Sequence, residues 1–181
     1  YWYGPHIYGE LGTRYFMRDA MGIAAGLNEY SRQSDMVFMA NYAQTVNVIG
    51  CIKTNTTSSV LDATGQVLKM YRQHFGTIPV AISGETRPVD IAATLDEEGK
   101  KLTISVVNAT WDEVRIPVTL LNGTIAGEGE LWQVTAPDDM ATNEPGRPEN
   151  VKITGPAKVA SGTALTVGPA SISLFVFNLG N

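Results

Sequence analysis

The spacing of apolar residues changes near residue 80, and this change limits the fold more than any other feature of the sequence. Before that point apolar residues recur every three or four positions, as in an α-helix that packs on one side. After it they alternate with other residues, as in β-strands with one buried face. We therefore predict an α/β segment over residues 1–80 and an all-β domain over residues 81–181.

Two helices and one strand are predicted in the α/β segment. Helical spacing predicts one helix within residues 12–31 and another over residues 64–75, with Gly76 as the glycine that ends it. Between the helices, the continuous apolar run 36–40 favours a strand buried on both faces, as in a parallel sheet. This order is typical of the end of a βα repeat, which is too short to close a sheet alone.

Short alternating runs joined by turns are typical of the second part. The runs 89–95 and 102–106 flank turn-forming residues 96–100, which predicts a β-hairpin. Pro117 lies inside another alternating run and indicates an edge strand or a bulge. Residues 136–150 contain three prolines and are predicted to form a long surface loop. Together these features favour an antiparallel β-sandwich.

Composition and charge exclude several classes of function. The net charge of -5 gives no general attraction to nucleic acid or to anionic lipid, and no apolar run approaches the about 20 residues that span a membrane. One cysteine, Cys51, and two distant histidines provide no disulfide framework and no metal-ligand cluster. We therefore expect no nucleic acid, membrane, metal or cofactor. Localisation, cytoplasmic or secreted, stays open, as does glycosylation at the Asn-X-Thr sequons, of which Asn108 begins one.

Amide side chains follow directly after the predicted strand at 36–40. Gln44 and Asn47 lie where α/β folds bind ligands, at the carboxyl end of a strand. An amide offers donors and an acceptor, which suits a neutral polyol, but it can equally satisfy loop backbone groups. The aromatic residues 1–3 are either a wall for a sugar ring or part of the core. His6, close to them, is either at the rim of a pocket or structural.

Hydrolysis of a glycosidic bond needs a pair of carboxyl groups, and residues 1–50 offer no convincing pair. Asp19 and Glu29 belong to the first predicted helix and are expected to be solvated. Asp35 precedes the predicted strand, at the end opposite to the amides. Glu10 lies near the aromatic cluster without an evident partner.

Residues 41–49, Asn-Tyr-Ala-Gln-Thr-Val-Asn-Val-Ile, closely resemble the segment after the eighth barrel strand in glycoside hydrolase family 51. The pattern there is alanine-glutamine, a variable residue, then valine-asparagine-valine-isoleucine. Residues 1–3 resemble the tail of that family's nucleophile motif, and residues 18–27 resemble its seventh barrel helix. The resemblance covers essentially the whole chain. It implies the C-terminal part of a TIM (β/α)8 barrel, from the end of strand 7 through helix 8, followed by a jelly-roll-like β-sandwich.

Members of that family are retaining enzymes, most often α-L-arabinofuranosidases acting on arabinan or arabinoxylan. The resemblance implies that Gln44 hydrogen-bonds the arabinose ring and that Trp2 walls the sugar pocket, with Asn47 bracing the loop. Both catalytic residues of the family are glutamates, and the nucleophile aligns three positions before Tyr1. We therefore expect no catalytic residue in this chain, and a partner chain that carries both glutamates and the N-terminal part of the barrel. The resemblance also implies that the whole enzyme is a homo-oligomer.

Two other functions stay open. One is an endo-glucanase or xylan-active relative of the same family, with a longer cleft in place of a pocket. The other is a carbohydrate-binding β-sandwich module without catalysis. For that module the sequence offers only Trp111 and Trp132 as aromatic platforms.

Overall fold

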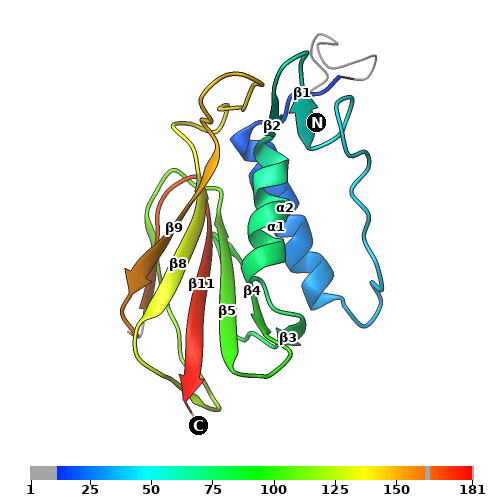
Figure 1. Cartoon of the computed structure of the whole chain (residues 1–181). Helices are drawn as coiled ribbons and strands as arrows, with labels where there is room; N and C mark the ends of the chain where they lie inside the picture. The colour runs from blue at the N-terminus through cyan, green and yellow to red at the C-terminus, as the bar shows by residue number, and fades with distance from the viewer. Residues whose placement is uncertain (1–11, 162–163, 181) are drawn as a thin grey trace.

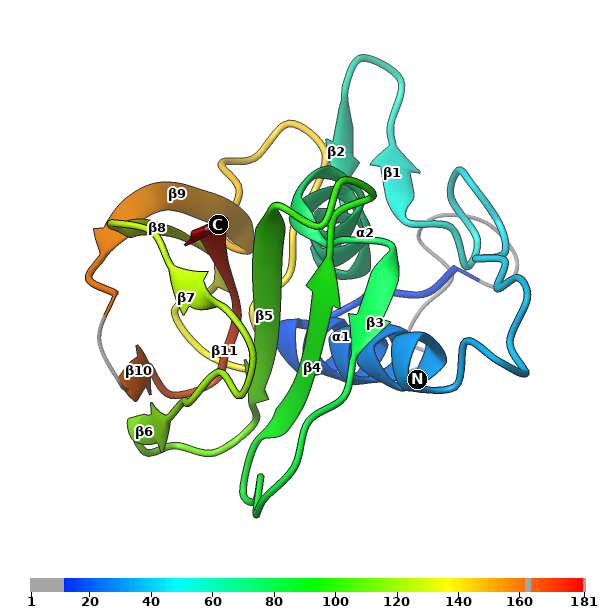
Figure 2. The same ribbon diagram turned by 90° about the horizontal axis from the view of Figure 1, so that it is seen from below.

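The computed structural model describes residues 12–161 and 164–180, and these form three layers. Two helices, α1 (Met17–Arg32) and α2 (Ala63–His74), cover one face of a large antiparallel sheet (Figure 1). A two-stranded sheet lies on the opposite face (Figure 2). A separate hairpin of β1 (Ile52–Thr54) and β2 (Ser59–Leu61) precedes α2.

The large sheet contains seven strands, and the described strands that pair with one another in it are all antiparallel. Its order is β3-β4-β5-β11-β8-β9, with β7 paired to the end of β11. The small sheet pairs β6 with β10. The bounds are β3 (Ile78–Val80), β4 (Asp90–Leu95), β5 (Lys101–Asn108), β6 (Val114–Pro117), β7 (Thr124–Ile125), β8 (Gly129–Thr135), β9 (Lys152–Val159), β10 (Ala164–Val167) and β11 (Ser171–Gly180).

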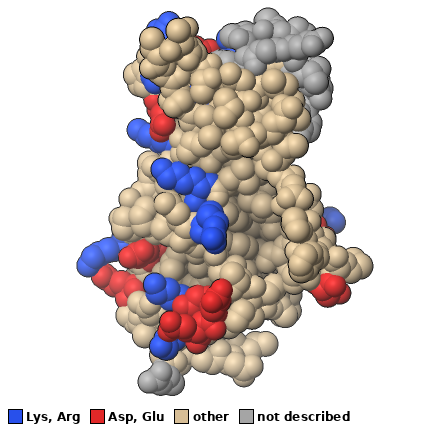
Figure 3. Space-filling model, turned by 45° about the vertical axis from the view of Figure 1, so that its right-hand side comes forward, with Lys and Arg blue, Asp and Glu red and all other residues tan. Residues whose placement is uncertain are grey.

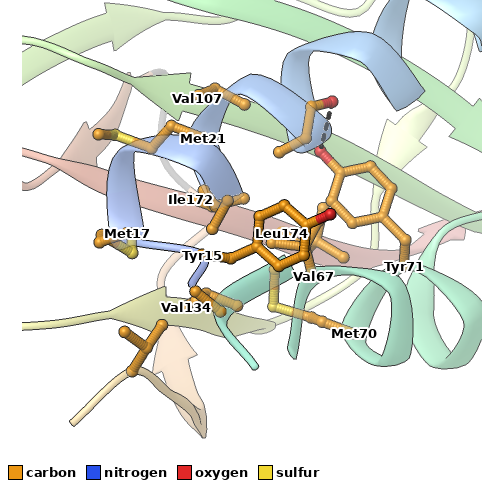
Figure 4. Packing of buried hydrophobic residues seen from close by; sticks show 14 residues of the cluster. Tyr15, Met17, Met21, Val67, Met70, Tyr71, Val107, Val134, Ile172 and Leu174 are labelled. Atoms are coloured by element: carbon orange, nitrogen blue, oxygen red, sulfur yellow. Dashed lines mark hydrogen bonds between the residues drawn. The ribbon is translucent and has the colours of Figure 1, made fainter. Parts of the chain in front are cut away.

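Alternation along β5 divides the interior into two cores, as the period-two pattern predicts. Leu102, Ile104 and Val106 face the small sheet and pack with residues such as Phe175. Val107 faces the helices. The helix-side core, drawn in Figure 4, joins residues from both helices to the sheet, and its labelled members are Tyr15, Met17, Met21, Val67, Met70, Tyr71, Val107, Val134, Ile172 and Leu174.

Both helices form where the sequence predicts them, and each begins at a carboxylate. The Asp19 side chain accepts a hydrogen bond of 2.8 Å from the Phe16 amide at the start of α1. Asp62 accepts one of 2.8 Å from the Ala63 amide at the start of α2. Such bonds satisfy amides that have no partner within the helix, and a negative charge there also favours the helix dipole.

Gly76 follows α2 as predicted, but for a different physical reason. It does not adopt the left-handed conformation typical of a helix-ending glycine. A Cβ at this position would instead collide with the backbone carbonyl of Leu95 in β4. The Gly76 amide donates to the Thr94 hydroxyl over 2.8 Å, so the close approach of α2 and β4 explains the glycine.

The predicted turn and edge strand are confirmed. Residues 96–100 connect β4 to β5, and the Asp96 amide donates to the Lys101 carbonyl over 3.1 Å. Pro117 pairs with Ala164 in the two-stranded sheet, whose strands each have a single partner among the described residues. A proline is tolerated there because an edge strand does not need every amide in its ladder.

The strand predicted over residues 36–40 is not formed. These residues run along the outside of the helix layer without helix or strand structure (Figure 1). Met36, Phe38 and Met39 are 75%, 94% and 64% exposed. A strand needs a neighbouring backbone to satisfy its amides and carbonyls, and within the described chain none lies alongside.

The segment 136–150 has no strand or helix, as expected of a loop, but it is more than a surface loop. The carbonyls of Asp139 and Ala141 accept the first amides of α1, from Arg18 and Met17, each over 2.9 Å. Asn143 is buried and its side chain bonds four backbone groups. The predicted boundary at residues 80 and 81 stays a prediction, although the sheet already includes β3 before it.

Candidate functional site

The segment 41–49 is fastened at both ends. The Tyr42 hydroxyl lies 2.9 Å from the Thr64 hydroxyl in the first turn of α2. The carbonyl of Ile49 accepts a hydrogen bond of 2.7 Å from the Tyr15 hydroxyl. Anchoring on both sides fixes the path of the backbone between them, so this segment does not need to be ordered when a ligand binds.

Asn47 braces this segment instead of facing outward. Its carboxamide oxygen accepts from the Thr54 amide over 2.8 Å, and its nitrogen donates to the Thr54 hydroxyl over 2.9 Å. Asn47 and Val48 both have positive φ, at 51° and 45°. Asparagine tolerates that conformation better than most residues, whereas a β-branched valine does not. The pair of bonds to Thr54 holds this tight bend closed.

Gln44 lies between the two anchors and is exposed. Within the described residues its side chain makes no hydrogen bond, so both ends of the amide are available to a ligand. The neighbouring backbone is held: the Thr45 carbonyl accepts from the Ile52 amide over 3.1 Å. The peptide bond between Ala43 and Gln44 is cis. Neither cavity described below includes Gln44 among its lining residues.

The other predicted site residues at the start of the chain, Trp2 and His6, lie outside the described residues, as does Glu10. Their position relative to Gln44 therefore stays a prediction.

Two buried residues of opposite charge, Lys53 and Asp62, lie close to the anchored segment, and the sequence patterns did not reveal their burial. Lys53 is fully buried, and its ammonium donates to the Val48 carbonyl over 3.2 Å. It also lies 5.1 Å from the centre of the Tyr15 ring, a cation–π contact. Burial lowers the pKa of the Lys53 ammonium, and the Asp62 charge opposes that shift.

Asp62 is 1% exposed, and its carboxylate binds backbone groups within the fold. It accepts hydrogen bonds from the amides of Tyr15 and Ala63, and the Thr142 hydroxyl lies 3.4 Å from it. Burial raises the pKa of Asp62 to about 6, against the lowering effect of these bonds and of Lys53. Because the carboxylate is enclosed and occupied, it cannot reach a substrate. The described residues contain no group of three His, Cys, Asp or Glu that could hold a metal ion.

Two cavities open on the helix layer. The first, of about 440 Å³, lies between α1 and the loop after β5. The second, of about 420 Å³, is lined by residues 37–40 and by side chains from α1, α2 and β3, most of them apolar. In Figure 3 most charged side chains lie along the left edge and in the lower part of the face, and the upper centre is largely uncharged. No helix within the described ranges is long and apolar enough to cross a membrane.

The chain resembles known arabinofuranosidases in sequence. It is 31% identical over 153 residues to alpha-L-arabinofuranosidase C of Emericella nidulans, a match that covers 75% of this chain and 30% of that protein. A probable alpha-L-arabinofuranosidase C of Aspergillus flavus is 30% identical over 153 residues, with the same coverage. The chain thus spans about a third of the length of these curated relatives.

The fold matches solved arabinofuranosidases as well. The alpha-L-arabinofuranosidase of Thermotoga maritima, solved in complex with arabinose, superposes with a TM-score of 0.83 at 26% identity, over 94% of this chain and 40% of that one. The glycoside hydrolase family 51 enzyme of Thermotoga petrophila gives 0.81 at 27% identity, over 92% and 39%. The mostly β architecture with two helices is therefore that of the C-terminal portion of these enzymes.

The model of the alpha-L-arabinofuranosidase C-terminal domain matches residues 2–171, nearly the whole chain, and the chain therefore belongs to this family.

Proposed function

We propose that this chain is the C-terminal part of a retaining α-L-arabinofuranosidase that releases terminal arabinofuranose from arabinan or arabinoxylan. The observation that carries the proposal is the family match over residues 2–171, together with the exposed amide of Gln44 on an anchored segment. An amide held in this way can donate to one sugar hydroxyl and accept from another. Trp2 would form a wall of the same pocket.

The chemistry in this proposal comes from outside the chain. A retaining glycosidase uses two carboxyl groups about 5–5.5 Å apart, one as nucleophile and one as acid and base, through a covalent glycosyl-enzyme intermediate. Both would be glutamates of a partner chain that carries the N-terminal part of the barrel. This chain would contribute binding and orientation of the furanose, and no catalytic residue.

The segment 36–40 supports the proposed barrel. Its exposed apolar side chains, above all Phe38, are costly to leave in water, and the cavity beneath them is apolar as well. Strands of the partner on both sides would satisfy its backbone and cover these side chains. In the assembled enzyme we therefore propose that the segment becomes the last barrel strand, with Gln44 just past its end. We propose a homo-oligomer for the whole enzyme.

The test compares this chain alone with the assembled enzyme on an aryl α-L-arabinofuranoside. We expect no hydrolysis by the chain alone. The assembly should release arabinose with retained anomeric configuration, which NMR of the reaction mixture measures. A single 19.5 kDa species that cleaves the substrate would overturn the proposal. Activity on β-1,4-glucan or xylan without release of arabinose would favour the glucanase or xylanase function instead.

A further inference from the structure

The cavity of about 440 Å³ between α1 and the loop after β5 is lined by Trp111, by apolar side chains and by charged groups. We propose that it binds a neutral pentose oligosaccharide, as a second site without catalytic function. Its lining shares no residue with the segment around Gln44. The volume falls within the roughly 300–1,000 Å³ of small-molecule sites.

Trp111 lines this cavity, and hydrogen bonds already hold its loop in place before any ligand binds. The indole is 67% exposed. Three residues before it, the buried Asn108 donates to the carbonyls of Asp112 and Gly168, each over 2.8 Å, and accepts from the Thr110 amide over 3.0 Å. A large apolar ring presented to water on a rigid loop provides a flat surface for the C–H face of a sugar at little entropic cost.

The burial of Asn108 also bears on its Asn-X-Thr sequon. Its amide nitrogen is occupied by two carbonyls and the residue is fully buried, so a glycan cannot be attached there in the folded protein.

The cavity combines an apolar floor with polar groups at its rim. Met21, Val107 and Ala170 line the floor. Arg18 and Asp139 stand at the rim, and no ion pair within the described residues engages either side chain. A guanidinium donates hydrogen bonds and a carboxylate accepts them, which suits hydroxyl groups that do both.

The placement of Arg18 is unfavourable for the helix itself. It lies in the first turn of α1, where a positive charge opposes the helix dipole. Its guanidinium carbon lies 5.5 Å from the centre of the Phe16 ring, and no hydrogen bond or ion pair with another described residue engages the guanidinium. The exposed guanidinium therefore has donors that the hydroxyl groups of a ligand at the rim could use.

The charges at the rim select a neutral ligand. Asp139 and Arg18 carry opposite charges at the rim, so the lining gives no net attraction to an anionic sugar. Asp90 is already bound to Arg32 over 2.8 Å and to Asn28 over 2.6 Å, and it belongs to the scaffold. The choice of a pentose polymer, among neutral saccharides, rests on the proposed function.

The experiment uses the 181-residue chain in affinity gel electrophoresis and isothermal titration calorimetry. The probes are soluble arabinan and arabinoxylan, with polygalacturonate as the anionic control. The variants are Trp111→Ala, Trp111→Phe and Arg18→Met, with Tyr30→Ala as the matched loss of an exposed aromatic residue elsewhere on α1. Circular dichroism checks that each variant is folded.

We expect retardation by a neutral pentosan for the original chain, for Trp111→Phe and for Tyr30→Ala. Trp111→Ala should weaken binding about tenfold, the size of a stacking contact, and Arg18→Met should weaken it as well. Absence of binding to both pentosans, or binding that Trp111→Ala leaves unchanged, would overturn the proposal. Arabinose release by the assembled enzyme is measured separately, so failure here is distinct from failure of the proposed function.

Discussion

The hydroxyl of Tyr71 on α2 lies 2.6 Å from the hydroxyl of Ser105 on β5, and it also donates to the Asn28 side chain on α1 over 3.0 Å. One buried phenol thus connects both helices to the sheet. Burial raises the pKa of Tyr71 far above its usual range, which keeps the group neutral and able to donate. The contact lies within the core that the helices share with the sheet.

Tyr71→Phe removes this connection while keeping the ring. It leaves the Ser105 hydroxyl and the Asn28 amide with one buried partner fewer, so we expect a loss of about 1–3 kcal/mol in the free energy of unfolding. Urea denaturation followed by circular dichroism measures it. Tyr30→Phe, on the exposed side of α1, is the control and should change stability by less than about 0.5 kcal/mol. Equal effects of the two changes would contradict the role of the buried contact.

Asp62 predicts a dependence of stability on pH. Its folded pKa of about 6 lies above the about 3.9 of an unfolded chain. The contribution of Asp62 is therefore fully present below the unfolded value and is lost as the pH rises through about 6. Between pH 4 and pH 7 the stability of the original chain should fall relative to Asp62→Asn, by at most about 3 kcal/mol for a shift of this size.

Urea titrations at several pH values test this difference between the two proteins. Asp112→Asn, at an exposed aspartate, serves as the control and should follow the original chain at each pH. A difference between the original chain and Asp62→Asn that stays constant from pH 4 to pH 7 would show that Asp62 does not titrate in this window.

For His74 we expect the opposite dependence of stability on pH. Its ring stacks on Trp132 with centroids 4.1 Å apart, and burial lowers the pKa of His74, partly offset by the Glu130 charge. The fold therefore prefers the neutral imidazole, and that contribution is lost as the pH falls through the lowered pKa. An NMR titration should place the His74 midpoint below the about 6.5 of a free histidine.

The variant Trp132→Ala exposes the imidazole and should move the His74 midpoint upward, towards the ordinary value. His74→Gln assigns the resonance, since His6 is the other histidine of the chain. A midpoint that Trp132→Ala leaves unchanged would assign the shift to surroundings other than the stack.

Two glycines should respond to alanine in opposite directions. At Gly76 a Cβ would collide with the Leu95 carbonyl, so Gly76→Ala should destabilise by about 1–3 kcal/mol. Gly26 lies inside α1 with no neighbouring atom within 4 Å of the added Cβ, so Gly26→Ala should stabilise by about 0.5–1 kcal/mol. Thermal unfolding of both variants compares them directly, and a loss of stability at both positions would refute the explanation from close approach.

Gln44 gives the prediction that bears on activity. In the assembled enzyme, Gln44→Ala should lower kcat/KM for an aryl arabinofuranoside by about 10–100-fold, the worth of one or two hydrogen bonds to the sugar. Gln73→Ala, at an exposed glutamine of α2, is the matched control and should leave kcat/KM unchanged. Wild-type kinetics for Gln44→Ala would remove Gln44 from the site.

Local sequence patterns predicted correctly the elements that depend on residues close together in the chain. Helical spacing located α1 and α2, because an apolar stripe on a helix requires a core to cover it. The turn at 96–100 and the edge at Pro117 follow from backbone chemistry that a few residues determine. Sequence patterns did not predict the burial of Asn143, Lys53 and Asp62, because each polar group is buried only where distant segments supply its partners.

The sequence by itself determined the family, the two helices and the alternation of the sandwich strands, because these depend on residue type and spacing. Only the tertiary structure decided that residues 36–40 remain exposed. It also decided that the Leu95 carbonyl leaves no room for a side chain at position 76, and that Trp111 and Arg18 line the same cavity. The physical reason is that a strand needs a neighbouring backbone, and a cavity needs walls from several segments. Neither is encoded in the local order of residues.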